Sequence, residues 1–111
     1  MLDYLYRHAP SLVSELDTFW VQAGGSDVVA WIEKLSGRLP FIHLKDYGIK
    51  PPRDRYFAEI GRGNLDWHRI LPAAERAGCQ WFIVERDSGD VDPFESLRIS
   101  YDYLREHFAR H

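Results

Sequence analysis

The sequence predicts an α/β protein made of three consecutive strand–helix units with parallel strands. Segments with the two-residue alternation of a strand are each followed by a segment with the apolar spacing of an amphipathic helix. Repeated connections of this kind place successive strands parallel, with right-handed crossovers. Each predicted strand also ends in polar side chains, and the carboxyl ends of parallel strands lie along one edge of a sheet. That edge is where we expect the chemistry.

The composition is that of an ordinary globular domain, and it limits the partners. The 111 residues are 45% hydrophobic and 28% charged, with a net charge of −3, and a chain of this length buries one modest core. Acidic residues outnumber basic ones, so the chain lacks the basic surface that is typical of a nucleic-acid-binding protein. No apolar run approaches the length of a membrane span, and the single Cys79 has no partner for an internal disulfide. We expect a cytoplasmic protein that binds neither nucleic acid nor membrane.

The first strand–helix unit is expected at about 12–36, after a short helix at 1–9. Alternation from Leu12 to Phe19 predicts a strand on which Glu15 and Asp17 share one face. Two carboxylates on one face need a cation or water close by, because burying them unpaired is costly. The helix that follows is indicated by apolar residues at helical spacing: Val28, Trp31, Ile32 and Leu35.

The second unit, at about 40–78, begins with the central strand of the fold. Its alternation places Phe41, His43 and Lys45 on one face and turns the intervening apolar residues toward a covering helix. A loop over 47–65 follows, and loops of this length in compact domains are usually functional or disordered. Helical spacing then resumes in these apolar residues: Trp67, Ile70, Leu71, Ala74 and Ala77.

The third unit, at about 80–109, combines a strand from Trp81 to Glu85 with the last helix. Glu85 and Asp87 share a face at the end of this strand. Asp92 followed by proline is a strong signal for a helix start, because proline suits the first helical position. The buried stripe of this helix is predicted from its spacing: Phe94, Leu97, Tyr101, Leu104 and Phe108.

The strand ends bring two carboxylates and an imidazole to the same edge. Asp17, His43 and Glu85 end successive parallel strands in matching phase, and Lys45 follows on the face of His43. Mixed oxygen and nitrogen ligands of this kind suit a divalent cation such as Mn²⁺, Co²⁺, Zn²⁺ or Mg²⁺. The alternative is a set of three unrelated polar strand ends, with His43 merely hydrogen-bonded inside a buried strand.

Five short motifs occur in order over nearly the whole chain: ELDTFW at 15–20, HLKD at 43–46, FAEIG at 57–61, VERD at 84–87 and DPFESL at 92–97. Together they resemble the sugar phosphate isomerase/epimerase family, which belongs to the xylose isomerase-like TIM barrels. The resemblance implies that residues 1–111 form a partial barrel that corresponds to the last three units of a (β/α)₈ barrel. The helix at 1–9 is then a remnant of the unit before them.

The resemblance also implies a metal-assisted reaction. Family members hold one metal with a Glu, an Asp, a His and a second Glu, and Asp17, His43 and Glu85 match the last three of these ligands. Glu85 is then also a catalytic acid/base. The implied reaction is a proton transfer next to a carbonyl group, in a sugar, a sugar phosphate or a polyol, with the metal polarising the substrate oxygens.

Substrate contacts are expected from three further residues, namely Trp20, Lys45 and Glu59. Trp20 stands where the ketose epimerases carry a substrate-binding His, which argues against a simple ketose substrate. Lys45 projects toward the interior, where it would meet a phosphate or carbonyl oxygen or would instead pair with Glu15. Glu59 belongs to the FAEIG motif, whose match to the family places it near the substrate.

The chain departs from the family in one respect that bears on activity. The first Glu ligand of the family lies on a strand before the one that ends at Asp17, and only a short helix precedes that strand here. We therefore expect isomerase or epimerase chemistry that is incomplete in this chain alone. The alternative is an inactive half-barrel that assembles with itself or with a complementary chain. A DNA-repair AP endonuclease of the same fold is a weaker alternative, because the acidic chain has no phosphate-binding footprint.

Overall fold

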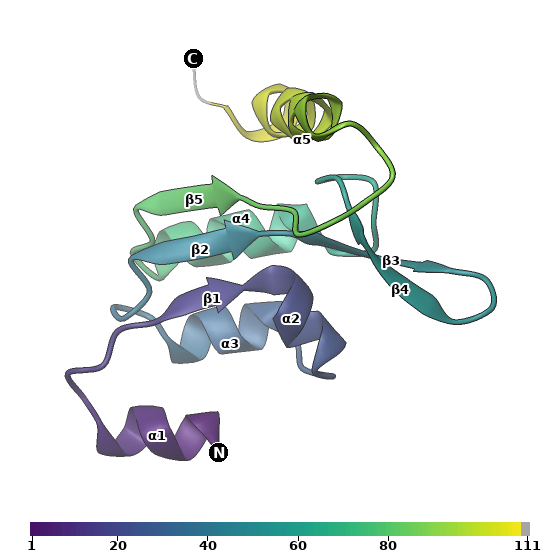
Figure 1. Ribbon diagram of the computed structural model, residues 1–111. Helices are drawn as coiled ribbons and strands as arrows, with labels where there is room; N and C mark the ends of the chain where they lie inside the picture. The colour runs from purple at the N-terminus through teal and green to yellow at the C-terminus, as the bar shows by residue number, and fades with distance from the viewer. Residues whose placement is uncertain (110–111) are drawn as a thin grey trace.

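The computed structural model describes residues 1–109, in which five helices and five strands are formed (Figure 1). In chain order they are α1 (Leu2–His8), β1 (Glu15–Asp17), α2 (Thr18–Ala23), α3 (Val28–Lys34), β2 (Phe41–Leu44), β3 (Asp46–Lys50), β4 (Asp54–Ala58), α4 (Trp67–Arg76), β5 (Trp81–Val84) and α5 (Pro93–Phe108). Strands β1, β2 and β5 form a parallel sheet with β2 in the centre, and β3 and β4 form a separate antiparallel hairpin. Within the described residues, no helix combines the length and the apolar character that crossing a membrane requires.

The register of β2 with its two neighbours decides which side chains meet. Asp17 of β1 and Ile83 of β5 both pair with His43, and Glu15 pairs with Phe41. Residues that pair across a sheet point to the same face. The alternation predicted from the sequence is therefore confirmed, and it gathers the polar strand ends on one side. We call this side the inner face of the sheet.

Helices α3 and α4 cover the other side of the sheet (Figure 1). Ile42 and Leu44 of β2 point into this layer and are buried. The residues that bury them come from the helices and connecting segments: Val28, Ile32, Leu35, Ile60, Trp67, Ile70, Leu71 and Ala74. Each large apolar side chain buried here contributes about 1.5–3 kcal/mol. This core fixes the orientation of β2 and so turns His43 toward the inner face.

The inner face itself carries large apolar side chains that stay accessible. Phe41, Trp81 and Ile83 are 40%, 62% and 41% exposed. In a complete barrel the corresponding positions are packed by side chains from the other strands. The sheet therefore has one packed side and one side on which apolar surface remains.

The first strand is shorter than its alternation predicts. β1 ends at Asp17, and α2 begins at Thr18, so the expected strand to Phe19 is wrong. The Asp17 carboxylate accepts a hydrogen bond of 3.1 Å from the Trp20 N–H. This contact caps α2, because the first N–H groups of a helix have no partners within it. Asp17 is thus both the last residue of β1 and the N-cap of α2.

The segment expected to be a long loop contains the β3–β4 hairpin. Asp46 pairs with Ala58 at its base, and Lys50 pairs with Asp54 beside the turn. Pro51 and the following proline lie at the turn, where the missing N–H groups do not interrupt a ladder. The sequence signal was obscured because neither strand alternates apolar with polar residues: two charged residues precede two aromatic ones in β4, and a glycine interrupts β3. The hairpin extends beyond the carboxyl end of β2 (Figure 1).

The apolar stripe predicted for α5 is buried only in part. Its first three members are exposed: Phe94, Leu97 and Tyr101. The buried positions in this half are instead Ser96 and Ser100. The Ser100 hydroxyl accepts a hydrogen bond of 3.0 Å from the Ile60 N–H, and the Ser96 hydroxyl donates to Glu59 at 2.9 Å. These small polar side chains anchor the helix to the segment after β4, which turns the predicted stripe outward.

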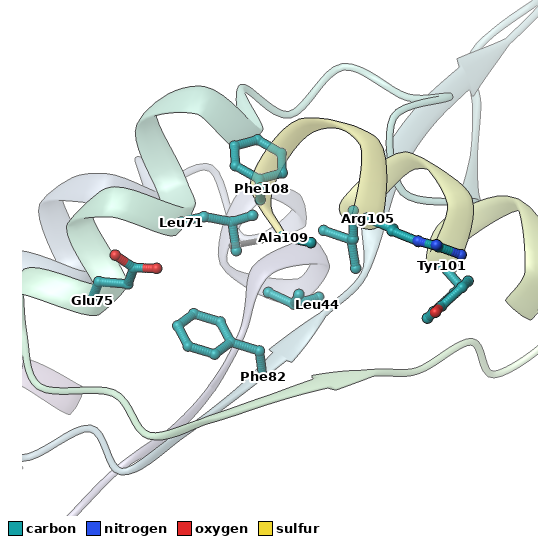
Figure 2. A pocket seen from close by; sticks show the side chains of 9 residues that line it. Leu44, Leu71, Glu75, Phe82, Tyr101, Arg105, Phe108 and Ala109 are labelled. Carbon is teal, nitrogen blue, oxygen red and sulfur yellow. The ribbon is translucent and has the colours of Figure 1, made fainter. Parts of the chain in front are cut away.

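A cavity of about 580 Å³ separates the end of α5 from β5 (Figure 2). Phe82 of β5 and Leu71 of α4 line it on the sheet side, and Tyr101 and Phe108 line it on the α5 side. Phe108 is half-buried against the core, as its place in the stripe predicts. The helix therefore contacts the core at its end but does not close over β5.

Candidate metal centre

His43 lies between two carboxylates at the end of the central strand. Its Nδ1 is 2.5 Å from Oε2 of Glu85, and its Nε2 is 2.5 Å from Oε1 of Glu15. Asp17 is its register partner in β1. Potential ligand atoms of Asp17, His43 and Glu85 all lie within 4.8 Å of one another, on half-buried side chains. The structure thus brings together the three residues that the sequence singled out as metal ligands, and we call Asp17, His43 and Glu85 the triad.

Lys45 inserts its ammonium group into this cluster. The side chain is only 2% exposed, and Nζ lies 2.9 Å from Asp17, 3.0 Å from Asp87 and 3.4 Å from Glu85. Burial by itself lowers the pKa of Lys45, but its hydrogen bonds to Asp17 and Asp87 and the nearby carboxylate charges raise the pKa overall. The expected alternative partner, Glu15, pairs with His43 instead. Lys45 is therefore a permanent cation that contacts two of the candidate ligands.

The backbone of Lys45 is held by a buried threonine at the start of α2. The Thr18 hydroxyl oxygen accepts a hydrogen bond of 2.9 Å from the Lys45 N–H and lies 2.8 Å from the Lys45 carbonyl, to which it donates. Thr18 is fully buried. Because Asp17 immediately precedes Thr18, this contact ties the ends of β1 and β2 together. The spacing between Asp17 and His43 consequently depends on rigid elements.

The charge of the cluster favours a further cation. The cluster contains four carboxylates and one ammonium group: Lys45 contacts Asp17, Glu85 and Asp87, and Glu15 contacts His43. Three negative charges are uncompensated when His43 is neutral, and carboxylates held this close repel one another. A divalent ion would cancel most of this excess, and the imidazole with two carboxylates provides a donor set typical of Mn²⁺, Co²⁺ or Zn²⁺. The residues present therefore fit a metal.

Asp46 organises the neighbourhood of the site, and the sequence reasoning missed it. Its buried carboxylate accepts hydrogen bonds of 2.8–3.1 Å from five donors: the N–H groups of Tyr47, Gly61, Gly63 and Leu65 and the indole Nε1 of Trp67. Burying a carboxylate is tolerable only when it is satisfied in this way. Asp46 thus joins the end of β2 to the Gly61–Gly63 turn and the start of α4. The signal was an acidic residue directly after a buried strand, followed by a glycine-rich segment.

Glu59 is not part of the triad and is already paired. Its Oε1 accepts hydrogen bonds of 2.9 Å from both Arg86 and Ser96. Arg86 also donates to the carbonyls of Ser88 and Val91, so the same guanidinium holds the segment that follows β5. Glu59 still lines a cavity under the hairpin. A substrate contact by Glu59 stays a prediction.

Trp20 stands beside the site as a half-exposed aromatic wall. Its ring packs edge-on against Phe19 and Phe57, with centroids 4.9 and 5.9 Å away. The Arg55 guanidinium lies 5.8 Å from its ring. Trp20 lines one depression together with Asp17 and a second together with the hairpin. It is therefore placed to contact a molecule bound next to the triad.

No family model matches this chain, and no curated protein matches it. Several solved structures do match this chain. A sugar phosphate isomerase/epimerase from Parabacteroides distasonis ATCC 8503 superposes with a TM-score of 0.67 at 27% identity, over 86% of this chain and 31% of that chain. A second protein of that description and organism gives 0.67 at 20%, over 86% and 32%. A xylose isomerase-like TIM barrel/4-hydroxyphenylpyruvate dioxygenase fusion protein gives 0.61 at 23%, over 94% and 18%.

These matches establish the fold. The three-stranded parallel sheet with its helices is part of a TIM barrel, as the sequence predicts, and the chain spans about a third or less of the solved structures that it matches. In such barrels the functional groups lie at the carboxyl ends of the strands. The triad occupies that edge of β1, β2 and β5.

Proposed function

We infer that the triad of this chain serves sugar chemistry, because the chain is a partial xylose isomerase-like TIM barrel with sugar phosphate isomerase/epimerases as its structural neighbours. Asp17, His43 and Glu85 bind one divalent metal, and Glu85 transfers a proton at a carbon next to a carbonyl group. The substrate is a small sugar, sugar phosphate or polyol. The observation that carries this proposal is the convergence of the three potential ligand atoms within 4.8 Å.

Three residues of this chain have separate roles in the proposed reaction. Glu85 uses Oε2 for its contacts with His43 and Lys45, which leaves Oε1 as the oxygen that exchanges the proton. The metal, when bound, polarises the substrate oxygens and acidifies the adjacent carbon–hydrogen bond. Lys45 partly neutralises Asp17 and Asp87, and a substrate oxygen would replace its longest contact, the one of 3.4 Å to Glu85. Trp20 shields the reacting carbon from water.

The chain supports this chemistry only in part by itself. The exposed inner-face residues Phe41, Trp81 and Ile83 and the two outer strands of the sheet require further strands for a closed barrel. We propose that the inner face packs against complementary barrel strands, which also supply the remaining metal ligand. Self-association is the alternative occupant of that face. The AP endonuclease alternative gains no support, since the described residues contain a single candidate metal group and no further histidines near it.

The test is hydrogen exchange at the substrate carbon in an assembled barrel. The chain is mixed with the first five strand–helix units of the Parabacteroides distasonis protein, assembly is verified by sedimentation, and deuterium uptake from D₂O into fructose or fructose 6-phosphate is followed by NMR with Mn²⁺. We expect uptake that Glu85→Gln abolishes. His68→Ala, which changes a histidine outside the triad, should leave it intact.

Two results would overturn the proposal. One is uptake that persists in a chelator or in the Glu85→Gln variant, because the proton would then move without the metal or the proposed base. The other is an assembled, Mn²⁺-binding mixture that shows no uptake with any sugar or sugar phosphate. Either result would leave the fold intact and remove the assignment of the reaction.

A further inference from the structure

A second cavity of about 650 Å³ lies next to the candidate metal centre, beneath the β3–β4 hairpin. Three elements contribute to it: α2, the hairpin and the segment between β5 and α5 (Figure 1). Its aromatic lining is Phe19, Trp20, Tyr56 and Phe57. Its charged lining is Lys50, Arg55, Glu59 and Asp90. Aromatic walls with a few charged groups are typical of small-molecule sites.

Two cations of this cavity have no acidic partner. The Lys50 ammonium lies 5.9 Å from the Tyr56 ring, and the Arg55 guanidinium lies 5.8 Å from the Trp20 ring. Over residues 1–109 neither cation forms an ion pair with a carboxylate. Stacking on a ring keeps a cation in place without neutralising its charge. Both positive charges are therefore available to a ligand.

The opposite wall of the cavity is braced and largely neutral. Arg86 donates to Glu59 at 2.9 Å and to the carbonyls of Ser88 and Val91 at 3.0 and 2.8 Å. The negative charge of Glu59 is thereby cancelled, which leaves Asp90 as the acidic group of the lining to set against two cations. The wall is also held in place before any ligand arrives, which lowers the entropic cost of binding.

The cavity and the cluster around Lys45 share one aromatic ring. Phe57 lines the cavity, and the Lys45 ammonium lies 5.3 Å from its ring. The same ammonium contacts Asp17 and Glu85 of the triad. Phe57 also packs on Phe19, with centroids 4.3 Å apart. The cavity and the cluster therefore adjoin at Phe57.

We propose that this cavity binds the phosphate group of a phosphorylated sugar, with the carbon skeleton lying on Trp20 and Phe57. Arg55 is its ligand on that face of the hairpin, and Lys50 reaches it around the hairpin edge from the other face. This assignment rests on the proposed function, because the carbonyl end of the same molecule would face the triad. Arg55 is suited to the role, since a guanidinium binds phosphate oxygens in pairs. The hairpin is then the element that selects a phosphorylated substrate over a neutral one.

The test is an NMR titration of the labelled chain in a chelator, so that metal binding plays no part. The probes are fructose 6-phosphate, fructose and inorganic phosphate. We expect fructose 6-phosphate to shift the amides of 50–57 and 88–91, and fructose to bind at least about tenfold more weakly, because charge-assisted hydrogen bonds are lost. Binding should also weaken as salt is raised, since both cations are exposed.

Variants make the assignment specific. Lys50→Gln and Arg55→Gln should each weaken fructose 6-phosphate binding about tenfold, and Arg55→Lys should restore part of it. The matched control is Lys34→Gln, which removes an exposed cation that lies 5.0 Å from the Trp31 ring on α3. It should change nothing. Preserved dispersion of the amide spectrum verifies that each variant is folded.

Three outcomes would overturn the proposal: amide shifts away from the hairpin or none at all, affinity unchanged in both Gln variants, and inorganic phosphate binding as tightly as fructose 6-phosphate. The last would indicate a site for free anions only. Because the titration contains no metal, failure here leaves the metal proposal standing. Failure of Mn²⁺ binding alone would likewise leave the phosphate site standing.

Discussion

The Lys45 ammonium lies 2.9 Å from the carboxylate of Asp17, deep in a cluster that carries three uncompensated negative charges. A lysine in this position holds together carboxylates from β1 and from the end of β5. It also contacts two of the three groups that we assign as metal ligands. The pair therefore links the stability of the sheet edge to the binding of a cation.

Lys45→Met tests this link, with Lys34→Met as the control. Removing the ammonium leaves the carboxylates to repel one another, and we expect unfolding in urea to become easier by roughly 1–3 kcal/mol, since the partners are partly exposed to water. Added Mn²⁺ should raise the melting temperature of Lys45→Met more than that of the unchanged chain. Equal effects of Mn²⁺ on both proteins would show that the lysine and the cation do not share these carboxylates.

Asp46→Asn tests the hydrogen-bonded carboxylate beside the site. All five groups that approach Asp46 are donors, and the NH₂ group of asparagine would face at least one of them. We expect a loss of about 2–4 kcal/mol in the free energy of unfolding. Asp54→Asn, on the exposed end of the hairpin, should cost less than about 0.5 kcal/mol. Comparable losses in both variants would remove the special role of Asp46.

The Cys79 thiol gives a pH-dependent probe of the core. Burial is the main cause that raises the pKa of Cys79, and a hydrogen bond with the Trp81 backbone opposes it only in part. A raised pKa lowers the fraction of reactive thiolate at any pH below it. Between pH 7 and 9, iodoacetamide should therefore react more slowly with the folded chain than with the chain in urea. Equal rates would mean that the segment between α4 and β5 is open.

The exposed inner face predicts association at working concentrations. Trp81 is the most exposed of its large apolar residues, at 62%, and the outer strands offer unpaired backbone groups. Sedimentation of the isolated chain should show species larger than a monomer, and Trp81→Thr should shift them toward the monomer. Tyr4→Thr removes an exposed aromatic residue of α1 and serves as the control. A monomer at all concentrations would contradict the prediction.

The sheet and the triad were predictable because both depend on alternation. Asp17, His43 and Glu85 have matching phase on strands whose apolar partners are buried by α3 and α4. A period of two decides the face of every side chain once one face is buried. The partner of Lys45 was not predictable, since Glu15 and Asp17 share a face and only the backbone contact with Thr18 places the ammonium next to Asp17.

The hairpin and α5 were harder to predict for a different reason. Neither has a simple buried face: the hairpin strands do not alternate apolar with polar residues, and α5 is anchored through Ser96 and Ser100. Helical spacing indicated Phe94 and Leu97 as buried because larger apolar residues usually are. Their burial depends on what packs against β5 and α5, and local sequence carries no information about that neighbour.

Calorimetric titration with Mn²⁺ tests the central claim most directly. The account predicts one weak site per chain, since loss of supporting groups typically reduces metal affinity by about 10–100-fold. Asp17→Asn, His43→Ala and Glu85→Gln should each abolish it, whereas His68→Ala and Glu95→Gln should have no effect. Tight binding that His43→Ala leaves unchanged would place the metal elsewhere and contradict the account.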